Sequence, residues 1–322
     1  MKIAIIGAGM AGLATARRLG DAHEVVLFDK SRGVGGRMST RYAGEYEFDH
    51  GAQYFTITDP AFREAVATAG QDASAVLWDS RGFYMKAGRA GPDTGRPRWV
   101  GAPRMNSLPK ALAAGLDIRL GRRIASVQGS AGALQLQFED GATEGPFDRV
   151  ICTAPAPQAA ALLPDGSPLQ ADLARVRMHA CFALMVGWPE PFDPDWDTLR
   201  APDLPVSWIA RNQAKPGRNA DISSLVVHAA PDWSDAHVES DRDHVRALML
   251  DTASTLCGRA LDGAPHIDLH RWLYAYAEGG VGRDCLSDDA SGILLAGDWC
   301  LGGRVEGAFL SGRAAARRVL QG

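Results

Sequence analysis

The 322-residue sequence is poor in lysine, has no closely spaced pair of cysteines and carries little net charge. Its five cysteines are an odd number and form no Cys-x-x-Cys motif, so we expect mostly buried free thiols in the reducing cytoplasm. A net charge of −4 gives no sign of the positive excess that binding to nucleic acid or to an anionic membrane requires. We therefore expect neither of these partners, and the oligomeric state is left open.

A metal site is not expected either. The eight histidines form no His-x-x-x-His pattern joined to Cys or Glu partners. His266 and His270 are four residues apart, but the alternation in HIDLHRW predicts a strand, in which this spacing does not converge on one metal. The sequence also has no internal repeat, no low-complexity tail and no apolar run long enough to suggest a membrane span.

Residues 3–19, IAIIGAGMAGLATARRL, admit two interpretations. An apolar run behind a lysine can serve as an export signal. The alternative is a buried strand that turns into a helix around a nucleotide, and the surrounding sequence favours it. KIAII is rich in β-branched residues, and HEVVLFD predicts a second buried strand that ends in Asp29. Between them, a G-x-G-x-x-G spacing is formed by Gly7, Gly9 and Gly12.

Each part of this motif has a physical purpose. Gly7 permits the tight turn, Gly9 lets the backbone approach a pyrophosphate, and Gly12 lets the helix pack against the strand. The pyrophosphate binds the free N–H groups at the start of the helix. Asp29 can accept hydrogen bonds from both ribose hydroxyls of an adenosine. The unit predicts an adenine dinucleotide without separating NAD from FAD.

Two further segments favour FAD. In KSRGVGGRMSTRY, Gly36 and Arg37 follow the ribose-binding acid and can wrap the far side of the pyrophosphate. Residues 292–320 predict a buried strand, a Gly-Asp turn and a terminal helix, and Asp298 in the turn can hydrogen-bond a ribityl hydroxyl. The start of that helix can face the flavin pyrimidine edge through Glu306, Gly307 and Ala308. NAD enzymes need no such second cradle.

These motifs resemble those of the flavin-containing amine oxidase superfamily and, within it, the bacterial renalase-like branch. The matching segments are RGVGGR, DHGAQYFT, RWVGAPRMNSLPKALAAGLDI, WSDAHV and GDWCLGGRVEGAFLSG, so the resemblance covers nearly the whole chain. It implies non-covalent FAD, because Cys300 lies just after Asp298, away from the attachment point of covalently flavinylated members. It also completes the expected cofactor contacts with Met10, Ala11, Lys30, Gly51, Ala52 and Ile124.

The resemblance implies an α/β fold with two domains. One is an FAD-binding Rossmann-like domain of the glutathione-reductase type, expected to be discontinuous, over residues 1–56, 98–155 and 287–322. The other is an α+β substrate domain built on an antiparallel sheet, over residues 57–97 and 156–286. HACFALMVGW, PVSWIARN and SSLVVHAA predict strands of that sheet, and the proline-rich residues 189–205 predict a loop.

The lysine content bears on the reaction. Amine oxidases of the superfamily generally keep a lysine on a substrate-domain strand, linked through water to flavin N5. The matching strand, RMHACFALMVGWPEPF, has none; Lys215 lies in a Pro-Gly turn, and Lys86 is an unmatched substitute.

The renalase-like branch oxidises 2- and 6-dihydro-NAD(P) isomers, passing hydride to flavin N5 and then reducing O2 to H2O2. The NAD(P)+ product is aromatic, so no general base is needed. Oxidation of a small amine and a low-turnover flavin-binding role are the alternatives.

A flat, amide-bearing substrate ring requires stacking surfaces and polar handles. Gln53 and Tyr54, in the segment that the resemblance places beside the flavin, are candidates. So are Trp272, Tyr274 and Trp299, although ordinary core packing is the alternative for each aromatic residue. Three isolated histidines could also contact the substrate, or simply be hydrogen-bonded within the structure: His228, His237 and His244.

Overall fold

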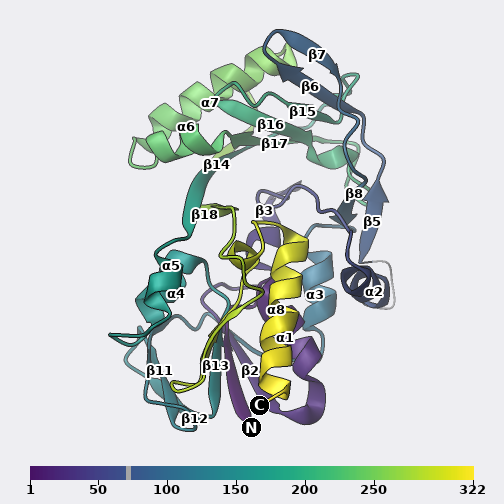
Figure 1. The fold of residues 1–322 in the computed structure, drawn as a ribbon. Helices are drawn as coiled ribbons and strands as arrows, with labels where there is room; N and C mark the ends of the chain where they lie inside the picture. Colours follow the sequence, from purple (N-terminus) through teal and green to yellow (C-terminus); the bar gives the residue numbers. More distant parts are fainter. Residues whose placement is uncertain (70–73) are drawn as a thin grey trace.

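The structure is a computed structural model that describes residues 1–69 and 74–322, and it contains two large sheets. Figure 1 shows the two sheets at opposite ends of the molecule, with β14 and β18 reaching from one towards the other. Both ends of the chain lie at the far end of the first sheet. Within the described residues, no helix has both the length and the apolar character needed to cross a membrane.

The first sheet has six strands and is parallel except for one edge strand. The segment KIAII forms its central strand β1, which is buried almost throughout, as a β-branched run covered on both faces should be. The strands in sheet order are β19 (Leu286–Asp288), β20 (Ile293–Leu295), β13 (Arg149–Cys152), β1 (Lys2–Ile6), β2 (Glu24–Asp29) and β9 (Asp117–Leu120).

Two helices from opposite ends of the chain pack together beside this sheet. Helix α1 (Met10–Leu19) follows β1, and helix α8 (Val305–Leu320) follows β20 and the short turn η4 (Asp298–Cys300). They lie side by side in Figure 1. A Cβ added at Gly312 of α8 would be 2.1 Å from the carbonyl oxygen of Ala11, so this crossing requires glycine.

A three-stranded meander continues the first domain: β10 (Ile124–Gln128), β11 (Leu134–Phe138) and β12 (Thr143–Phe147). Two helices expected in the substrate domain, α4 (Ala156–Leu162) and α5 (Gln170–Leu173), contribute to the same hydrophobic cluster as this meander. The division into two domains remains a prediction. We propose that the first domain extends to the end of α5, beyond the expected boundary at residue 155.

The second large sheet has seven strands and is antiparallel except where β15 pairs with β6. Helices α6 (Pro231–Ala236) and α7 (Arg242–Cys257) belong to this part, and the Asp241 side chain caps α7. The strands in order are β18 (His266–Glu278), β14 (Arg177–Trp188), β17 (Ser223–Ala229), β16 (Val206–Arg211), β15 (Thr198–Arg200), β6 (Gly82–Lys86) and β7 (Arg89–Pro92).

The prediction of an uninterrupted loop over residues 189–205 is wrong at β15. Its prolines flank residues 198–200 and leave their N–H groups available for pairing with the strands on either side, β16 and β6. The remaining elements are two short pairs, two helices and three 3-10 turns: β3 (Arg41–Ala43) with β4 (Tyr46–Phe48), β5 (Ala75–Trp78) with β8 (Arg98–Gly101), α2 (Pro60–Thr68), α3 (Ser107–Ala113), η1 (Gly20–Ala22), η2 (Gly36–Met38) and η3 (Asn212–Ala214).

Candidate functional site

A cavity of about 2110 Å³ is lined by residues from both large sheets. One part is formed by the glycine loop after β1, the end of β2 and the loop before η2. The other part is formed by residues 50–56 and by strands β14 to β18 of the second sheet. The segments predicted to bind a dinucleotide and those predicted to bind a substrate therefore share one cavity.

The glycine loop has the local geometry that the motif predicts. Gly7 has φ +106°, and a Cβ there would lie 2.6 Å from the Thr153 hydroxyl. Gly9, Met10 and Ala11 line the cavity. Gly12 does not: a Cβ there would be 1.9 Å from the carbonyl oxygen of Gly7, so Gly12 serves helix packing and is not a cofactor contact.

The two glycine turns leave a cradle of the kind that a dinucleotide needs. An added Cβ at Gly9 would meet no atom within 4 Å among the described residues, and one at Gly36 would meet only the Cα of Gly9, at 3.6 Å. Side chains at these two positions would therefore fill open space between the turns. The backbone on both sides is free to approach a phosphate closely, which fits FAD.

Asp29 lies at the end of β2 on the cavity wall, where the sequence places the ribose-binding acid. Its carboxylate accepts hydrogen bonds from the N–H groups of Ala8 and Ser31, both at 2.7 Å, which fix its position. Lys30 and Ile124 also line this end of the cavity. Burial, followed by the nearby Arg123, lowers the pKa of Lys30.

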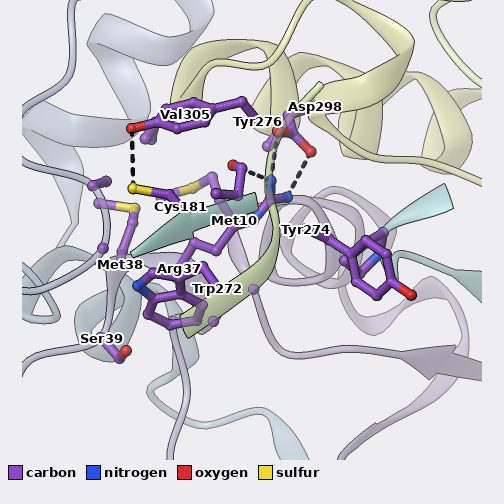
Figure 2. A pocket seen from close by; sticks show the side chains of 18 of the residues that line it. Met10, Arg37, Met38, Ser39, Cys181, Trp272, Tyr274, Tyr276, Asp298 and Val305 are labelled. Carbon is purple, nitrogen blue, oxygen red and sulfur yellow. Dashed lines mark hydrogen bonds and ion pairs between the residues drawn. The ribbon is translucent and has the colours of Figure 1, made fainter. Parts of the chain in front are cut away.

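Arg37 and Asp298, which the sequence assigns to separate cofactor contacts, bind each other. Two hydrogen bonds join the guanidinium to the carboxylate, Nη2 to Oδ1 at 2.6 Å and Nη1 to Oδ2 at 2.8 Å (Figure 2). Arg37 Nη1 also donates to the carbonyl oxygen of Ala275, at 3.1 Å. Both residues line the cavity. The pair thus ties the second glycine turn to the C-terminal Gly-Asp turn and to β18.

At the start of α8, the side chain of Glu306 is directed to the segment before α2. Its carboxylate accepts hydrogen bonds from the N–H groups of Thr58 and Asp59, at 2.6 and 2.8 Å, and from the Thr58 hydroxyl. Burial alone would raise the pKa of Glu306, but these hydrogen bonds lower it. Glu306 and Ala308 line the cavity, whereas Gly307 is buried against Leu301 and does not, which corrects the prediction for Gly307.

Gln53, Tyr54 and Trp272 all line the second part of the cavity, together with Gly51 and Ala52. Trp299 does not. It is fully buried in the hydrophobic cluster around the first sheet, where its indole N–H donates to the carbonyl oxygen of Ala154 at 3.1 Å. The expectation of a catalytic Trp299 is therefore wrong, and core packing explains this residue.

Three histidines surround Trp272 and Gln53. The rings of His50 and His270 are 5.0 and 4.4 Å from the ring of Trp272, and His228 Nε2 is 3.5 Å from Gln53 Nε2. Burial is the main cause that lowers the pKa of His50 to about 3 and those of His228 and His270 to about 4. All three are neutral at pH 7. His228 thus lines the cavity as a neutral group.

The two other histidines weighed in the sequence do not reach the cavity. His237 stacks on Trp233, with ring centroids 4.1 Å apart, and His244 is exposed on α7. Cys300 is also outside the cavity lining, and burial raises the pKa of its thiol to about 12. A buried neutral thiol away from the cavity agrees with non-covalent FAD.

Sequence reasoning missed several cavity residues, Cys181 and Tyr276 among them, and a buried charge cluster. Cys181 and Tyr276 line the cavity, and the Tyr276 hydroxyl contacts the Cys181 sulfur at 3.8 Å (Figure 2). The alternation of large side chains in HRWLYAYA is the signal that could have pointed to Tyr276. No comparable signal marks Cys181.

The charge cluster lies behind Gln53 and contains Lys215. The Lys215 ammonium has no exposed surface; it is 3.3 Å from an Asp49 oxygen and 3.4 Å from Gln53 Oε1. Arg218 binds the same Asp49 oxygen at 2.6 Å. Burial alone would raise the pKa of Asp49, but Lys215 and Arg218 hold it well below its usual range. Burial lowers the pKa of Lys215 to about 8, against the opposing effect of Asp49.

Comparisons with known proteins agree with this architecture. The family model described as flavin containing amine oxidoreductase matches residues 73–320, and that of an NAD(P)-binding Rossmann-like domain matches residues 5–68. Staphylococcus aureus 4,4'-diapophytoene desaturase is 38% identical over 73 residues, which are 22% of this chain and 14% of that protein. The chain thus spans only a small part of that relative.

Solved structures match over the full length. A protein described as a protoporphyrinogen oxidase from Exiguobacterium sp. 255-15 superposes with a TM-score of 0.82 at 15% identity, covering 100% of this chain and 99% of that one. Cyclohexylamine oxidase from Brevibacterium oxydans IH-35A gives 0.79 at 14% identity, covering 99% and 98%. At such identities these likenesses show the fold, and they confirm the predicted α/β architecture.

Proposed function

Because the chain belongs to the flavin-containing amine oxidoreductase family, we propose that it is an FAD-dependent oxidase of the renalase-like branch, acting on 2- and 6-dihydro-NAD(P) isomers. FAD as cofactor and an oxidoreductase activity follow from the family. The substrate is our inference from the chemistry of the cavity wall. The competing substrate is a small amine, which is a cation at neutral pH.

The observation that carries the proposal is the charge of the cavity. All five carboxylates that line it are already engaged: Asp29 and Glu306 with backbone N–H groups, and Asp93, Glu139 and Asp298 with arginines. Twelve lysine and arginine side chains line it: Lys30, Arg32, Arg37, Arg41, Arg96, Arg98, Lys110, Arg122, Arg123, Arg200, Arg271 and Arg304. Five of these cations are in ion pairs themselves, and the phosphates of FAD would meet those at the glycine-loop end. The charge left at the second-sheet end, where Arg96 and Arg200 have no carboxylate partner among the described residues, favours a substrate with phosphates over a cationic amine.

The groups around Gln53 support the same substrate. The three histidines there are weak bases, because their pKa values are lowered to about 3 to 4, and β14 carries no lysine. None of these groups is therefore matched to taking a proton from an amine at neutral pH. Lys215 is enclosed behind Gln53 and bound to Asp49. A dihydronicotinamide loses only a hydride, because its product is an aromatic cation, and therefore needs no base.

We assign the following roles to the chain's own residues. The backbone of the glycine turns would hold the FAD pyrophosphate, and Asp29 the adenosine ribose. Trp272 and Tyr54 would enclose the flat substrate ring. Gln53 would hold this part of the cavity wall in place, because its amide nitrogen already donates to the carbonyl oxygens of Asp49 and Gly51 and its amide oxygen accepts from Lys215. When bound, FAD supplies the hydride acceptor, and O2 then removes the electrons as H2O2.

Anaerobic stopped-flow mixing tests the proposal. The FAD-loaded protein is mixed with 2-, 4- and 6-dihydro-NAD(P) and with simple amines, and bleaching of the flavin absorbance is followed. We expect rapid bleaching with the 2- and 6-isomers and recovery of the absorbance, with H2O2, when air is admitted. Faster bleaching by an amine would establish the amine oxidase alternative. Slow bleaching by every compound would favour the low-turnover flavin-binding alternative.

A further inference from the structure

A single register row crosses six strands of the seven-stranded sheet. Cα pairing joins His270 to Ala183, Ala183 to His228, His228 to Trp208, Trp208 to Arg200 and Arg200 to Tyr84. Residues paired in this way lie on the same face of a sheet. His270, His228, Trp208 and Arg200 line the cavity, so this is the face turned towards it.

The chemistry changes along this row. The end at β18 and β17 holds the neutral histidines beside Gln53, where we place the reacting ring. Trp208 comes next: its ring is 5.5 Å from that of Tyr54, and the Arg98 guanidinium lies 5.3 Å from it. These contacts make an aromatic platform with a cation above it. The platform can stack a flat or apolar part of a ligand.

The other end of the row is cationic. The Arg200 guanidinium lies 5.5 Å from the Tyr84 ring and, within the described residues, has no carboxylate partner. Arg96 also lines the cavity and likewise lacks a carboxylate partner in the part of the chain described. Arg98 is different, because Asp93 already binds it at 2.5 Å. Arg200 and Arg96 are therefore available to an anion.

The size of the cavity leaves room for such an anion. Its volume of about 2110 Å³ is about twice the upper end of the roughly 300–1,000 Å³ typical of a pocket for one drug-sized ligand, so the cavity can hold a second ligand beside FAD. Neighbouring strands are about 4.8 Å apart, so two strand steps separate His228 from Arg200 by roughly 10 Å. One ribosyl phosphate unit can bridge that span.

We propose that Trp208, Arg200 and Arg96 form a subsite for the phosphate-bearing, non-reacting end of the substrate. This inference rests on the proposed function and deepens it, since it assigns the part of a dinucleotide substrate that does not react. Arg200 is a specificity-determining residue in this assignment and takes no part in hydride transfer. Guanidinium groups suit the task because they bind phosphate oxygens in a bidentate manner.

The test compares two substrates on the FAD-loaded enzyme. One is 6-dihydro-NAD, and the other is the 6-dihydronicotinamide riboside, which has the same reacting ring but no phosphate. We expect Arg200→Gln to raise KM for the dinucleotide by at least about 10-fold, as the loss of a charge-assisted hydrogen bond should. Its kcat for the dinucleotide, and both constants for the riboside, should stay unchanged. Arg96→Gln should add to the effect.

A matched control is Arg89→Gln, because Arg89 is an exposed arginine on β7 of the same sheet and does not line the cavity. It should leave all constants at the wild-type value. An equal rise in KM for the riboside and the dinucleotide, or no rise for either, would overturn the subsite.

The subsite can also fail or succeed separately from the proposed function. ADP-ribose binding to the oxidised holoenzyme, followed by calorimetry, requires no turnover. Weaker binding to the Arg200→Gln variant than to the wild type would support the subsite even if no dihydronicotinamide bleached the flavin. Equal binding to both proteins would refute it even if the oxidase activity were confirmed.

Discussion

Lys215 is the residue whose environment departs furthest from its local sequence. Its neighbours Pro216 and Gly217 favour an exposed turn, yet the ammonium is enclosed with Asp49, Arg218 and Gln53. Asp49 lies 166 positions away, directly after β4, so the pairing depends on how the β3–β4 pair packs against the second sheet. The sequence shows only two short polar segments, and nothing in their spacing relates them.

We predict that Lys215→Met lowers the free energy of unfolding by roughly 3 kcal/mol, because it leaves Asp49 buried with one cation fewer. Urea denaturation of the FAD-loaded protein measures the change. Lys86→Met, at an exposed position on β6, is the control and should have little effect. An unchanged urea midpoint for the Lys215 variant would show that Arg218 alone compensates Asp49.

At the scale of secondary-structure elements, the crossing of α1 and α8 couples stability to the cofactor site. Both helices begin at the cavity, at Met10 and Val305. Besides the close approach at Gly312, the Thr15 hydroxyl of α1 donates to the Gly312 carbonyl oxygen at 3.0 Å. A displacement of α8 would therefore move the helix starts apart.

Gly312→Val should destabilise the protein by roughly 3 kcal/mol through overpacking of this crossing. It should also weaken FAD binding, measured by quenching of flavin fluorescence on titration into the apoprotein. Arg317→Ala, on the exposed side of the same helix, should leave both quantities near the wild-type values. A Gly312→Val variant with normal stability and FAD affinity would contradict the crossing described here.

Sequence patterns predicted correctly those parts of the structure that depend on one short segment of the chain. The glycine loop and Asp29 belong to a single strand–helix–strand unit, so their spacing was sufficient to place them. The pair of Arg37 and Asp298 joins residues 261 positions apart, and no local pattern encodes it. Trp299 was misassigned for a related reason: its position beside the Gly-Asp turn does not reveal which way the indole faces.

At the scale of the whole molecule, the buried histidines set the response to acid. His50 and His228 are neutral in the folded protein, with pKa values of about 3 and 4, but titrate near 6.5 when unfolded. Between pH 6.5 and 4 the unfolded chain therefore binds more protons, and stability falls as the pH falls. These two groups give a slope of about 3 kcal/mol per pH unit at pH 5, to which His270, with a pKa also lowered to about 4, adds.

Urea unfolding of the holoprotein at pH 7.5, 6.5 and 5.5 measures this slope. We expect little dependence above pH 7 from these groups and a steep loss below pH 6.5. The double variant His50→Asn, His228→Gln should flatten the acid limb, whereas the exposed His244→Gln should not. An acid limb equally steep in the double variant would assign the loss of stability to other groups.

The order of strands in the first sheet has a consequence for biosynthesis. Strand β20, which is made long after β1 and β13, is the neighbour of β13, and β13 itself pairs with β1. Asp298 and the start of α8 follow β20 and complete the cavity wall. A ribosome-bound chain that still lacks these residues has its glycine loop but no closed receptacle for the flavin. Cofactor capture must therefore wait until the start of α8 has left the exit tunnel.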